Sequence, residues 1–173
     1  MTQESTLTKI PENSSLLQAT KYTFVIPELP FARYFCQKVD VPGVSTNAVN
    51  VPTPFSVTKR HGDTLVWSDF TMSVLLDEDI RVWEETLNWL ISLTKPTKFP
   101  QYHHREGKVF NLYYDGILTL NTNSNIPNLR IKFHDFHPVN LGPLRFDTTT
   151  SAEETLVVDI SFAYDYYEIE RLT

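Results

Sequence analysis

Apolar and polar residues alternate along the second half of Thr64–Leu76, which is the pattern of a strand with one buried face. The apolar positions of this strand are Phe70, Met72, Val74 and Leu76. After Asp77–Asp79 the apolar residues recur every three or four positions instead. This change predicts an amphipathic helix at about residues 78–94, with Asp77 as its N-cap and Pro96 beyond its end. The apolar stripe that should lie on a sheet consists of Ile80, Trp83, Leu87, Leu90 and Ile91 and is widened by Val82 and Trp89, while Ser92 is among the residues expected on the polar side.

Five other segments carry strand patterns, namely Tyr22–Ile26, Ala32–Asp40, Val109–Thr122, Asn128–Leu141 and Thr155–Ile169. In the fourth of these, the side chains expected to point inward are Leu129, Ile131, Phe133 and Val139. Many strands and one helix predict an α+β fold, in which an antiparallel β-sandwich or barrel has one flanking α-helix. The polar residues 1–20 are predicted to form an N-terminal arm, and residues 21–173 a single domain.

A long connection, Ser45–Thr64, separates the early strands from the helix. Pro52 and Pro54 exclude it from a central strand, because proline cannot donate a ladder hydrogen bond. Long connections in compact domains are usually functional. We therefore predict a loop or β-ribbon at about residues 45–64 that projects from the body. Its apolar side chains are too many for a free loop, and we expect them to contact other subunits: Val49, Val51, Phe55 and Val57.

The composition narrows the classes of function. Hydrophobic residues make up 41% of the 173 residues, which is typical of a folded domain, and the net charge of −6 disfavours nucleic-acid binding. Cys36 is the only cysteine, so an intramolecular disulfide is excluded and a place in the core is expected. No apolar run reaches the roughly 18 residues of a membrane span, and no signal-peptide pattern opens the chain. We expect synthesis in the cytoplasm and no membrane anchoring.

Histidines provide the best candidate for a metal site: His103 and His104 lie near Glu106, and His134 and His137 follow later. Histidines adjacent or three apart in a strand point to opposite faces, so a shared site would require distant loops to converge. Helix capping explains the three acids 77–79 better than cation binding does. The five glycines are scattered and form no phosphate-binding loop. We predict no catalytic residue, no cofactor and no metal ion, and therefore no enzyme.

Three segments share an order with a known family. "FARYFCQKVDVPGV" is a strand with a cysteine that leads to Pro-Gly. "HGDTLVWSDFTMSVLLDEDIRVWEETLNWL" places Gly-Asp before a strand, an acidic group and a helix. "FHPVNLGPLRFDTTTSAEETLVVDISFAYDYYEI" places a Pro-x-Asn-x-Gly turn before a final strand that ends in Asp-Tyr. Together they span about residues 31–169 and resemble the tail tube proteins of T-even-like contractile-tailed bacteriophages.

The resemblance implies a structural subunit of the phage tail, located in the virion. Such subunits form hexameric rings that stack into a hollow tube for DNA ejection, and a contractile sheath surrounds the tube. The implied partners are further copies of the chain, sheath proteins and baseplate proteins, while DNA passes through without specific binding. The segment "KYTFVIPELP" also resembles paralogues that form the first tube ring on the baseplate. A baseplate initiator and an Hcp-like tube subunit of a secretion or injection system therefore stay as alternatives.

A tube around DNA should present like charge to it. Three acids interrupt strands on the face opposite their apolar residues, and they are our candidates for the lumen: Asp69, Asp159 and Asp165. Two other classes of function remain open. A monomeric binding module would present an aromatic platform, and a metal-dependent enzyme would use His103, His104 and His134.

Overall fold

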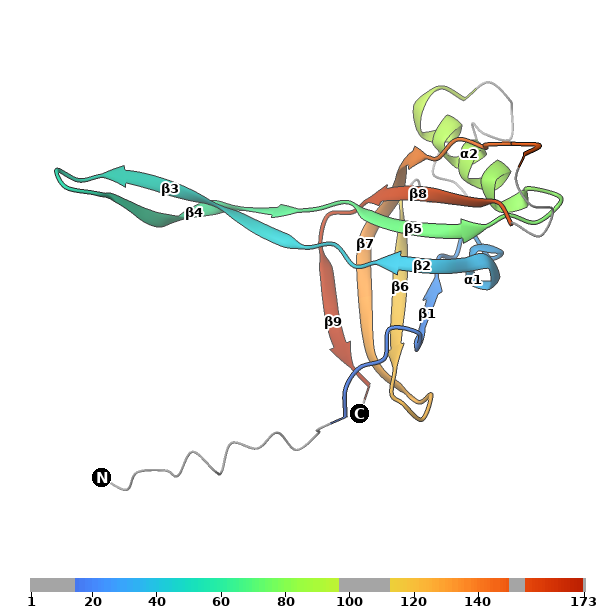
Figure 1. Cartoon of the computed structure of the whole chain (residues 1–173), viewed down its shortest axis with the longest axis horizontal. Helices are drawn as coiled ribbons and strands as arrows, with labels where there is room; N and C mark the ends of the chain where they lie inside the picture. Colours follow the sequence, from blue (N-terminus) through green and yellow to red (C-terminus); the bar gives the residue numbers. More distant parts are fainter. Residues whose placement is uncertain (1–14, 97–112, 150–154, 173) are drawn as a thin grey trace.

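The computed structural model describes residues 15–96, 113–149 and 155–172 (Figure 1). Its elements, in chain order, are β1 (Tyr22–Val25), α1 (Ala32–Phe35), β2 (Cys36–Asp40), β3 (Val44–Pro52), β4 (Val57–Trp67), β5 (Phe70–Leu75), α2 (Arg81–Thr94), β6 (Tyr114–Asn121), β7 (Pro127–Leu141), β8 (Val157–Ala163) and β9 (Tyr167–Arg171). All strand pairs are antiparallel. The predicted α+β class, with an antiparallel sheet and one main helix, is confirmed.

The body is a sheet of seven strands in which β7 belongs to two layers. The path runs β1-β6-β7-β8-β5-β2, and β9 also pairs with β7. The first half of β7 pairs with β6 and β9, and the second half pairs with β8. Between the halves Asp135 has a φ of 54°, and the ladder shifts register there. A bulge bends a strand, and the strands of the two layers consequently cross in Figure 1. We call the layers the β6 layer (β1, β6, β9 and the first half of β7) and the β8 layer (β2, β5, β8 and the second half of β7).

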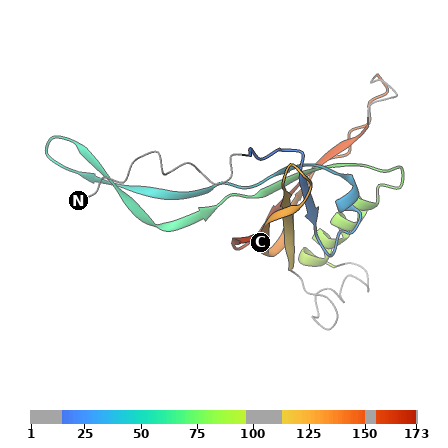
Figure 2. The same ribbon diagram turned by 90° about the horizontal axis from the view of Figure 1, so that it is seen from below.

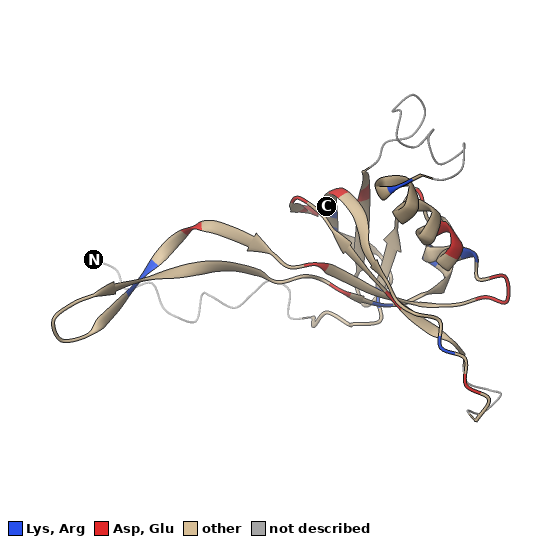
Figure 3. Cartoon of the chain, turned by 90° about the horizontal axis from the view of Figure 1, so that it is seen from above, with Lys and Arg blue, Asp and Glu red and all other residues tan. Residues whose placement is uncertain are grey.

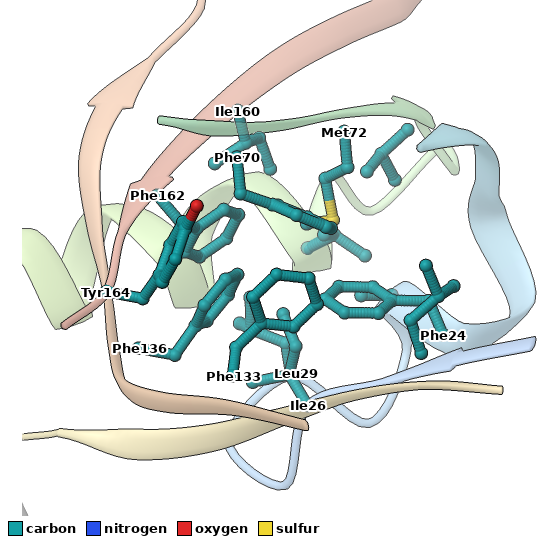
Figure 4. Close-up of a cluster of buried hydrophobic side chains, with 14 of the residues drawn as sticks. Phe24, Ile26, Leu29, Phe70, Met72, Phe133, Phe136, Ile160, Phe162 and Tyr164 are labelled. Carbon is teal, nitrogen blue, oxygen red and sulfur yellow. The ribbon is translucent and has the colours of Figure 1, made fainter. Parts of the chain in front are cut away.

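Aromatic side chains fill the space between the layers (Figure 4). The Phe70 ring lies at the centre, and its centroid is 4.8 Å from that of Phe24 and 5.0 Å from that of Phe133. Phe136 and Phe162 stack on each other at 4.5 Å. All five rings are buried. Each buried phenylalanine stabilises the fold by about 1.5–3 kcal/mol, so this cluster accounts for much of the body's stability.

Helix α2 packs on β7 through a face that agrees only in part with the predicted stripe. Its buried residues are Val82, Thr86, Trp89 and Ser92, whereas Leu87, Leu90 and Ile91 are half-buried. Two hydroxyls can be buried because each donates to a carbonyl of the same helix: Thr86 Oγ1 to Val82 at 2.7 Å, and Ser92 Oγ to Trp89 at 2.7 Å. The Trp89 ring contacts Tyr114 and Phe162. The buried face is therefore centred on Val82 and Trp89, which were expected only to widen the stripe, and it includes Ser92, which was expected on the polar side.

The start of α2 also differs from the predicted start at about residue 78. The helix begins at Arg81, and the residue before it, Ile80, has a left-handed φ of 48°. Asp77 still caps the helix from outside this turn, because its carboxylate accepts the Arg81 N–H at 3.1 Å. No helix among the described residues is both long and apolar enough to cross a membrane.

Three predicted strands need correction. Ala32–Asp40 begins as the short helix α1, and Thr64–Leu76 is divided between β4 and β5. Thr155–Ile169 is likewise divided between β8 and β9. Val139 was expected to point inward, but it is exposed because the bulge at Asp135 reverses the alternation that follows it. The boundary between an arm (1–20) and a domain (21–173) stays a prediction, since residues 1–14 lie outside the described residues.

Candidate assembly surfaces

The strands β3 and β4 form a two-stranded ribbon that projects from the body (Figures 1 and 2). It pairs from Val44–Trp67 at its base to Pro52–Val57 near its tip. A register shift interrupts the ladder between Thr46 and Ala48, opposite Gly62. A Cβ at Gly62 would overlap the carbonyl oxygen of Asn47, so this position requires glycine. The predicted β-ribbon at about residues 45–64 is confirmed, with slightly wider bounds.

A closed turn holds the tip of the ribbon. The Thr53 N–H donates to the Ser56 carbonyl at 2.8 Å, and the Ser56 N–H donates to Thr53 Oγ1 at 3.2 Å. Pro52 and Pro54 restrict the backbone here. Phe55, between these groups, is 100% exposed. A rigid turn therefore presents one aromatic ring to the surroundings.

The other candidate contact residues are also exposed: Val49, Val51 and Val57. Every residue of β3 is exposed, and in β4 only Gly62 and Trp67 are partly covered. The ribbon thus has no core of its own in the single chain. Whether these side chains contact another subunit stays a prediction.

The outer face of the β8 layer carries short polar side chains, and we call it the hydroxyl face. Cross-strand register aligns them in two rows, Asp40–Thr71–Ser161–Asn140 and Lys38–Ser73–Asp159. Ser73 Oγ donates to Asp159 at 2.6 Å, and Lys38 Nζ contacts Asp40 at 2.6 Å. The hydrogen bond that Lys38 donates to Asp40 raises the pKa of Lys38. Most of the polar groups on this face therefore already have partners within the chain.

Asp159 lies on the hydroxyl face, but the other two lumen candidates lie at the end of the layer. Asp69 is in the turn before β5, and Asp165 is in the turn after β8. Tyr164 Oη donates to the Ser68 carbonyl at 3.0 Å and so joins these two turns. Burial, with smaller effects from Tyr167 and Asp69, raises the pKa of Tyr164 to about 12. The structure therefore brings Asp69 and Asp165 into adjacent turns and keeps Asp159 apart from them.

The outer face of the β6 layer carries longer charged side chains that the sequence reading had not paired. Lys132 Nζ lies 2.9 Å from Asp115, and an Arg130–Glu170 pair at 3.4 Å joins β7 to β9. His134 lies between Asp115, at 3.5 Å, and Glu168, at 3.9 Å. Its ring stacks on Tyr166. Exposed pairs of this kind contribute about 0–1 kcal/mol each, so they order the face more than they stabilise it.

A family model for the phage tail tube protein matches residues 10–170. The chain belongs to the phage tail tube protein family. As a member of this family it is a structural protein of a phage tail and not an enzyme. A search of curated proteins finds no match.

Solved structures agree with a tail tube fold. The chain is similar to a structure titled as the anti-feeding prophage cap (AFP tube terminating cap), with a TM-score of 0.60, 11% identity and coverage of 98% of this chain and 100% of that one. It is also similar to the PVC sheath-tube complex of an extracellular contractile injection system in the extended state (TM-score 0.59, 11% identity, coverage 92% and 94%). A third is the anti-feeding prophage baseplate, 6-fold symmetrised (TM-score 0.60, 8% identity, coverage 91% and 97%). At such identities the likeness shows the fold alone.

The histidine candidates contribute no site to the described part of this tail tube protein. His103, His104 and Glu106 lie outside the described residues. The bulge at Asp135 places His134 and His137 on the same side of β7 and not on opposite sides, but each has its own partners: His134 the carboxylates above, His137 the Asp135 carbonyl and the Tyr113 ring. No group of three His, Cys, Asp or Glu in the described ranges is arranged to hold a metal ion.

Cys36 packs against the edge of the core of this tail tube protein and is half-buried. Burial raises the pKa of its thiol to about 11. The thiolate is the reactive form of cysteine, so this side chain is a weak nucleophile near neutral pH. The prediction of a packing role agrees with this environment.

Proposed function

We propose that this tail tube protein assembles into closed rings, most simply hexamers, which stack into a hollow tube for DNA ejection inside a contractile sheath. The observation that carries the proposal is the ribbon, because it exposes large apolar side chains on a segment with no core. Isolated two-stranded hairpins are marginally stable in water. A contact with other subunits would bury Val49, Val51, Phe55 and Val57 and would hold the ribbon in place.

The edges of the β8 layer support ring closure. Among the described strands, β2 pairs only with β5, and the second half of β7 pairs only with β8. Because each pair in the layer is antiparallel, β2 and β7 run in opposite directions. The β2 edge of one copy can therefore continue the antiparallel order beside β7 of the next copy. Such a head-to-tail contact generates a ring when its rotation closes.

The hydroxyl face is our candidate for the wall of the lumen. Its side chains are short, and its one lysine is paired with Asp40. Basic side chains provide most of the attraction between proteins and DNA. A face of hydroxyls and of acids such as Asp159 would let DNA slide without adhering, with Asp69 and Asp165 at its end.

The proposed partners are sheath and baseplate proteins. Two of the similar structures come from particles whose titles name a sheath-tube complex and a baseplate. Because these particles are an injection system and an anti-feeding prophage, a tube subunit of an injection system or a first ring on a baseplate remains the second candidate. The two candidates share ring formation and differ in what passes through the tube.

Electron microscopy and light scattering of the purified full-length protein test the proposal. We expect rings with a central hole at moderate concentration, and tubes at high concentration or when baseplate proteins are added. Ring symmetry is read directly from end-on views. A protein that stays monomeric under all these conditions contradicts the proposed function.

A further inference from the structure

Two exposed aromatic side chains flank the edge strands of the β8 layer. Tyr34, in α1, is 81% exposed and comes just before β2, while Phe146 is 82% exposed and comes shortly after β7. Single exposed apolar side chains are common on protein surfaces. What distinguishes these two is their position in the strand order.

The strand directions bring these two residues together in the proposed ring. β2 of one copy would lie antiparallel beside the second half of β7 of the next copy, so the start of β2 would adjoin the end of that β7. Helix α1 precedes β2, and residues 142–149 follow β7. Figure 1 shows both at the same end of the β8 layer, away from the ribbon. A Phe146 side chain of one copy is therefore brought close to Tyr34 of its neighbour.

The α1 end of β2 also carries a cavity of about 450 Å³. The cavity lies between β1 and β2, the two ends of the strand path. Tyr22 Oη donates to the Gln37 carbonyl at 2.8 Å and so links these two strands. Cavities of about 300–1,000 Å³ hold drug-sized ligands, which are larger than a phenylalanine side chain. The single chain thus has room for an aromatic ring between its edge strands, in a lining that includes Tyr22, Phe24, Arg33, Tyr34, Cys36 and Gln37.

The segment that follows β7 is held to the body at its base. The Gly142 N–H donates to the Asp159 carbonyl at 2.8 Å, and Trp83 Nε1 donates to the Gly142 carbonyl at 3.2 Å. Leu144 packs against the core. Beyond this point the segment leaves the body on the side away from the ribbon (Figure 2). Phe146 is therefore presented outward close to an anchored position.

Charged side chains on the two sides are complementary. Arg33, at the cavity, has no ion pair among the described residues, and Asp147 on the segment after β7 can supply one. Arg145 of the same segment can meet the exposed Glu78, because the start of α2 lies beside α1 through a cation–ring contact to Phe31. Figure 3 shows charges of both signs on this segment and beside α2. A second copy of the chain is therefore a suitable partner for the cavity.

We infer that Phe146 of each copy enters the cavity between β1 and β2 of the neighbouring copy in the ring and packs on Tyr34 there. The inference rests on the proposed assembly into rings and adds an aromatic contact that only a second copy completes. Because the contact is head-to-tail, each copy supplies one Phe146 and one cavity. The same contact can therefore repeat around a closed ring.

A pair of single-thiol chains tests this contact directly. The Cys36→Ser variant removes the native thiol from the cavity and keeps a hydroxyl that can donate to the Lys38 carbonyl, as the thiol does. In this background, Tyr34→Cys is made in one chain and Phe146→Cys in another. The two chains are assembled separately and as an equal mixture, and a short thiol-to-thiol cross-linker is then added.

We expect covalent dimers from the mixture, with linked peptides that contain positions 34 and 146, and almost none from either chain alone. Assembled mixtures that give no dimers would overturn the inference. Equal dimer yields from one chain alone and from the mixture would also overturn it, because identical positions do not meet in a head-to-tail contact. If Phe146→Cys chains do not enter rings, Arg145→Cys keeps the aromatic ring and probes the same contact.

The strength of the contact is measured by the concentration at which rings form. Phe146→Ala should raise this concentration by about tenfold or more, because the variant cannot bury an aromatic side chain in its neighbour. Ile126→Ala, at an exposed position in the turn before β7, should leave it unchanged. An unchanged concentration for Phe146→Ala would mean that residues 1–14 or a different protein fill the cavity.

These outcomes separate the inference from the proposed function. If the natural chain and the Cys36→Ser variant form no rings, the proposed function fails and the inference fails with it. If both form rings, but the mixture gives no dimers and Phe146→Ala assembles normally, the proposed function stands and this contact does not exist.

Discussion

The body and the ribbon are built from the same antiparallel pairing but differ in what covers their side chains. In the body, alternate residues of β5 are fully buried, and rings from β1, β5, β7 and β8 pack together. In the ribbon, β3 and β4 pair over most of their length, yet nearly all of their side chains face solvent. Hydrogen bonds contribute little net stability compared with apolar burial. The comparison predicts that the body is stable by itself, whereas the ribbon would gain most of its stability from the proposed contacts with other subunits.

The largest loss of stability should come from removing the ring at the centre of the core. Phe70→Ala should lower the free energy of unfolding by about 3–5 kcal/mol, because it leaves a cavity among four other rings. Such a loss is a large part of the 5–15 kcal/mol that is typical of a domain. Urea unfolding followed by circular dichroism measures it. A loss below about 1 kcal/mol would mean that the core is organised around other residues.

Replacing exposed apolar residues of the ribbon should leave the free energy of unfolding almost unchanged and should abolish assembly. In the variant with Val51→Asp and Phe55→Asp, the free energy of unfolding should stay within about 0.5 kcal/mol of the unmodified chain, because both side chains are exposed. Tubes should not form, since burial of these positions would then desolvate two carboxylates. Ser124→Asp, in the exposed turn before β7, controls for added charge. Normal tubes from the double variant would show that the ribbon is not a contact, and an unfolded variant would place both residues in the core.

Gly62→Ala should change the shape of the ribbon and leave its exposed side chains unaltered. The added methyl group overlaps the Asn47 carbonyl, so the two strands must separate or change register at this point. We expect a melting temperature close to that of the unmodified chain and fewer or irregular tubes in electron micrographs. Thr64→Ala, at an exposed position of the same strand, is the control. A melting temperature as low as that of Phe70→Ala would show that ribbon and body unfold as one unit.

Alkaline pH should weaken the body through Cys36. Because burial raises the pKa of this thiol from 9.0 to about 11, the unfolded chain loses its proton first. The thiol's contribution to stability is therefore complete below about pH 9 and is lost as the pH rises towards about 11. Unfolding free energies of the natural chain and Cys36→Ser should converge over this interval. A difference between them that does not change with pH would contradict this prediction.

The smallest expected effect concerns the hydroxyl face. Asp159→Lys removes the acceptor of the Ser73 hydroxyl, so stability should fall by about 0.5–1.5 kcal/mol. Assembled tubes of the variant should retain DNA weakly, and the retention should fall steeply as salt is added. Tubes of the unmodified chain should retain none. Equal DNA retention by both kinds of tube would place Asp159 away from the lumen.

Alternation along a single strand predicted the inward face of β5, because such a pattern depends only on neighbours in the chain. Alternation gave wrong predictions where the orientation of a side chain depends on a backbone irregularity or a hydrogen bond that the sequence does not indicate. No glycine marks the bulge at Asp135, so the exposure of Val139 was missed. Thr86 and Ser92 look polar in the sequence, and only their bonds to their own helix explain their burial.

The candidate assembly surfaces could likewise be predicted from the sequence only in part. The excess of apolar residues in the ribbon was visible in the sequence, but their division between two faces depends on the register that the bulge at Gly62 sets. The ion pairs that join β6, β7 and β9 involve residues up to 40 positions apart, and no local pattern aligns them. The alternation of charged residues along β7 and β9 was the sequence pattern from which these ion pairs could have been predicted.

Hydrogen–deuterium exchange of the full-length protein, free and assembled, tests whether the body is stable by itself and whether the ribbon becomes protected only on assembly. In the free chain, amides of β5, β7 and β8 should exchange slowly, while those of β3 and β4 exchange close to the rate of an open hairpin. On assembly the ribbon amides should slow to the range of the body, and the body should change little outside β2 and the second half of β7. A ribbon that is already as protected as the body in the free chain, or that stays unprotected in tubes, would contradict the account.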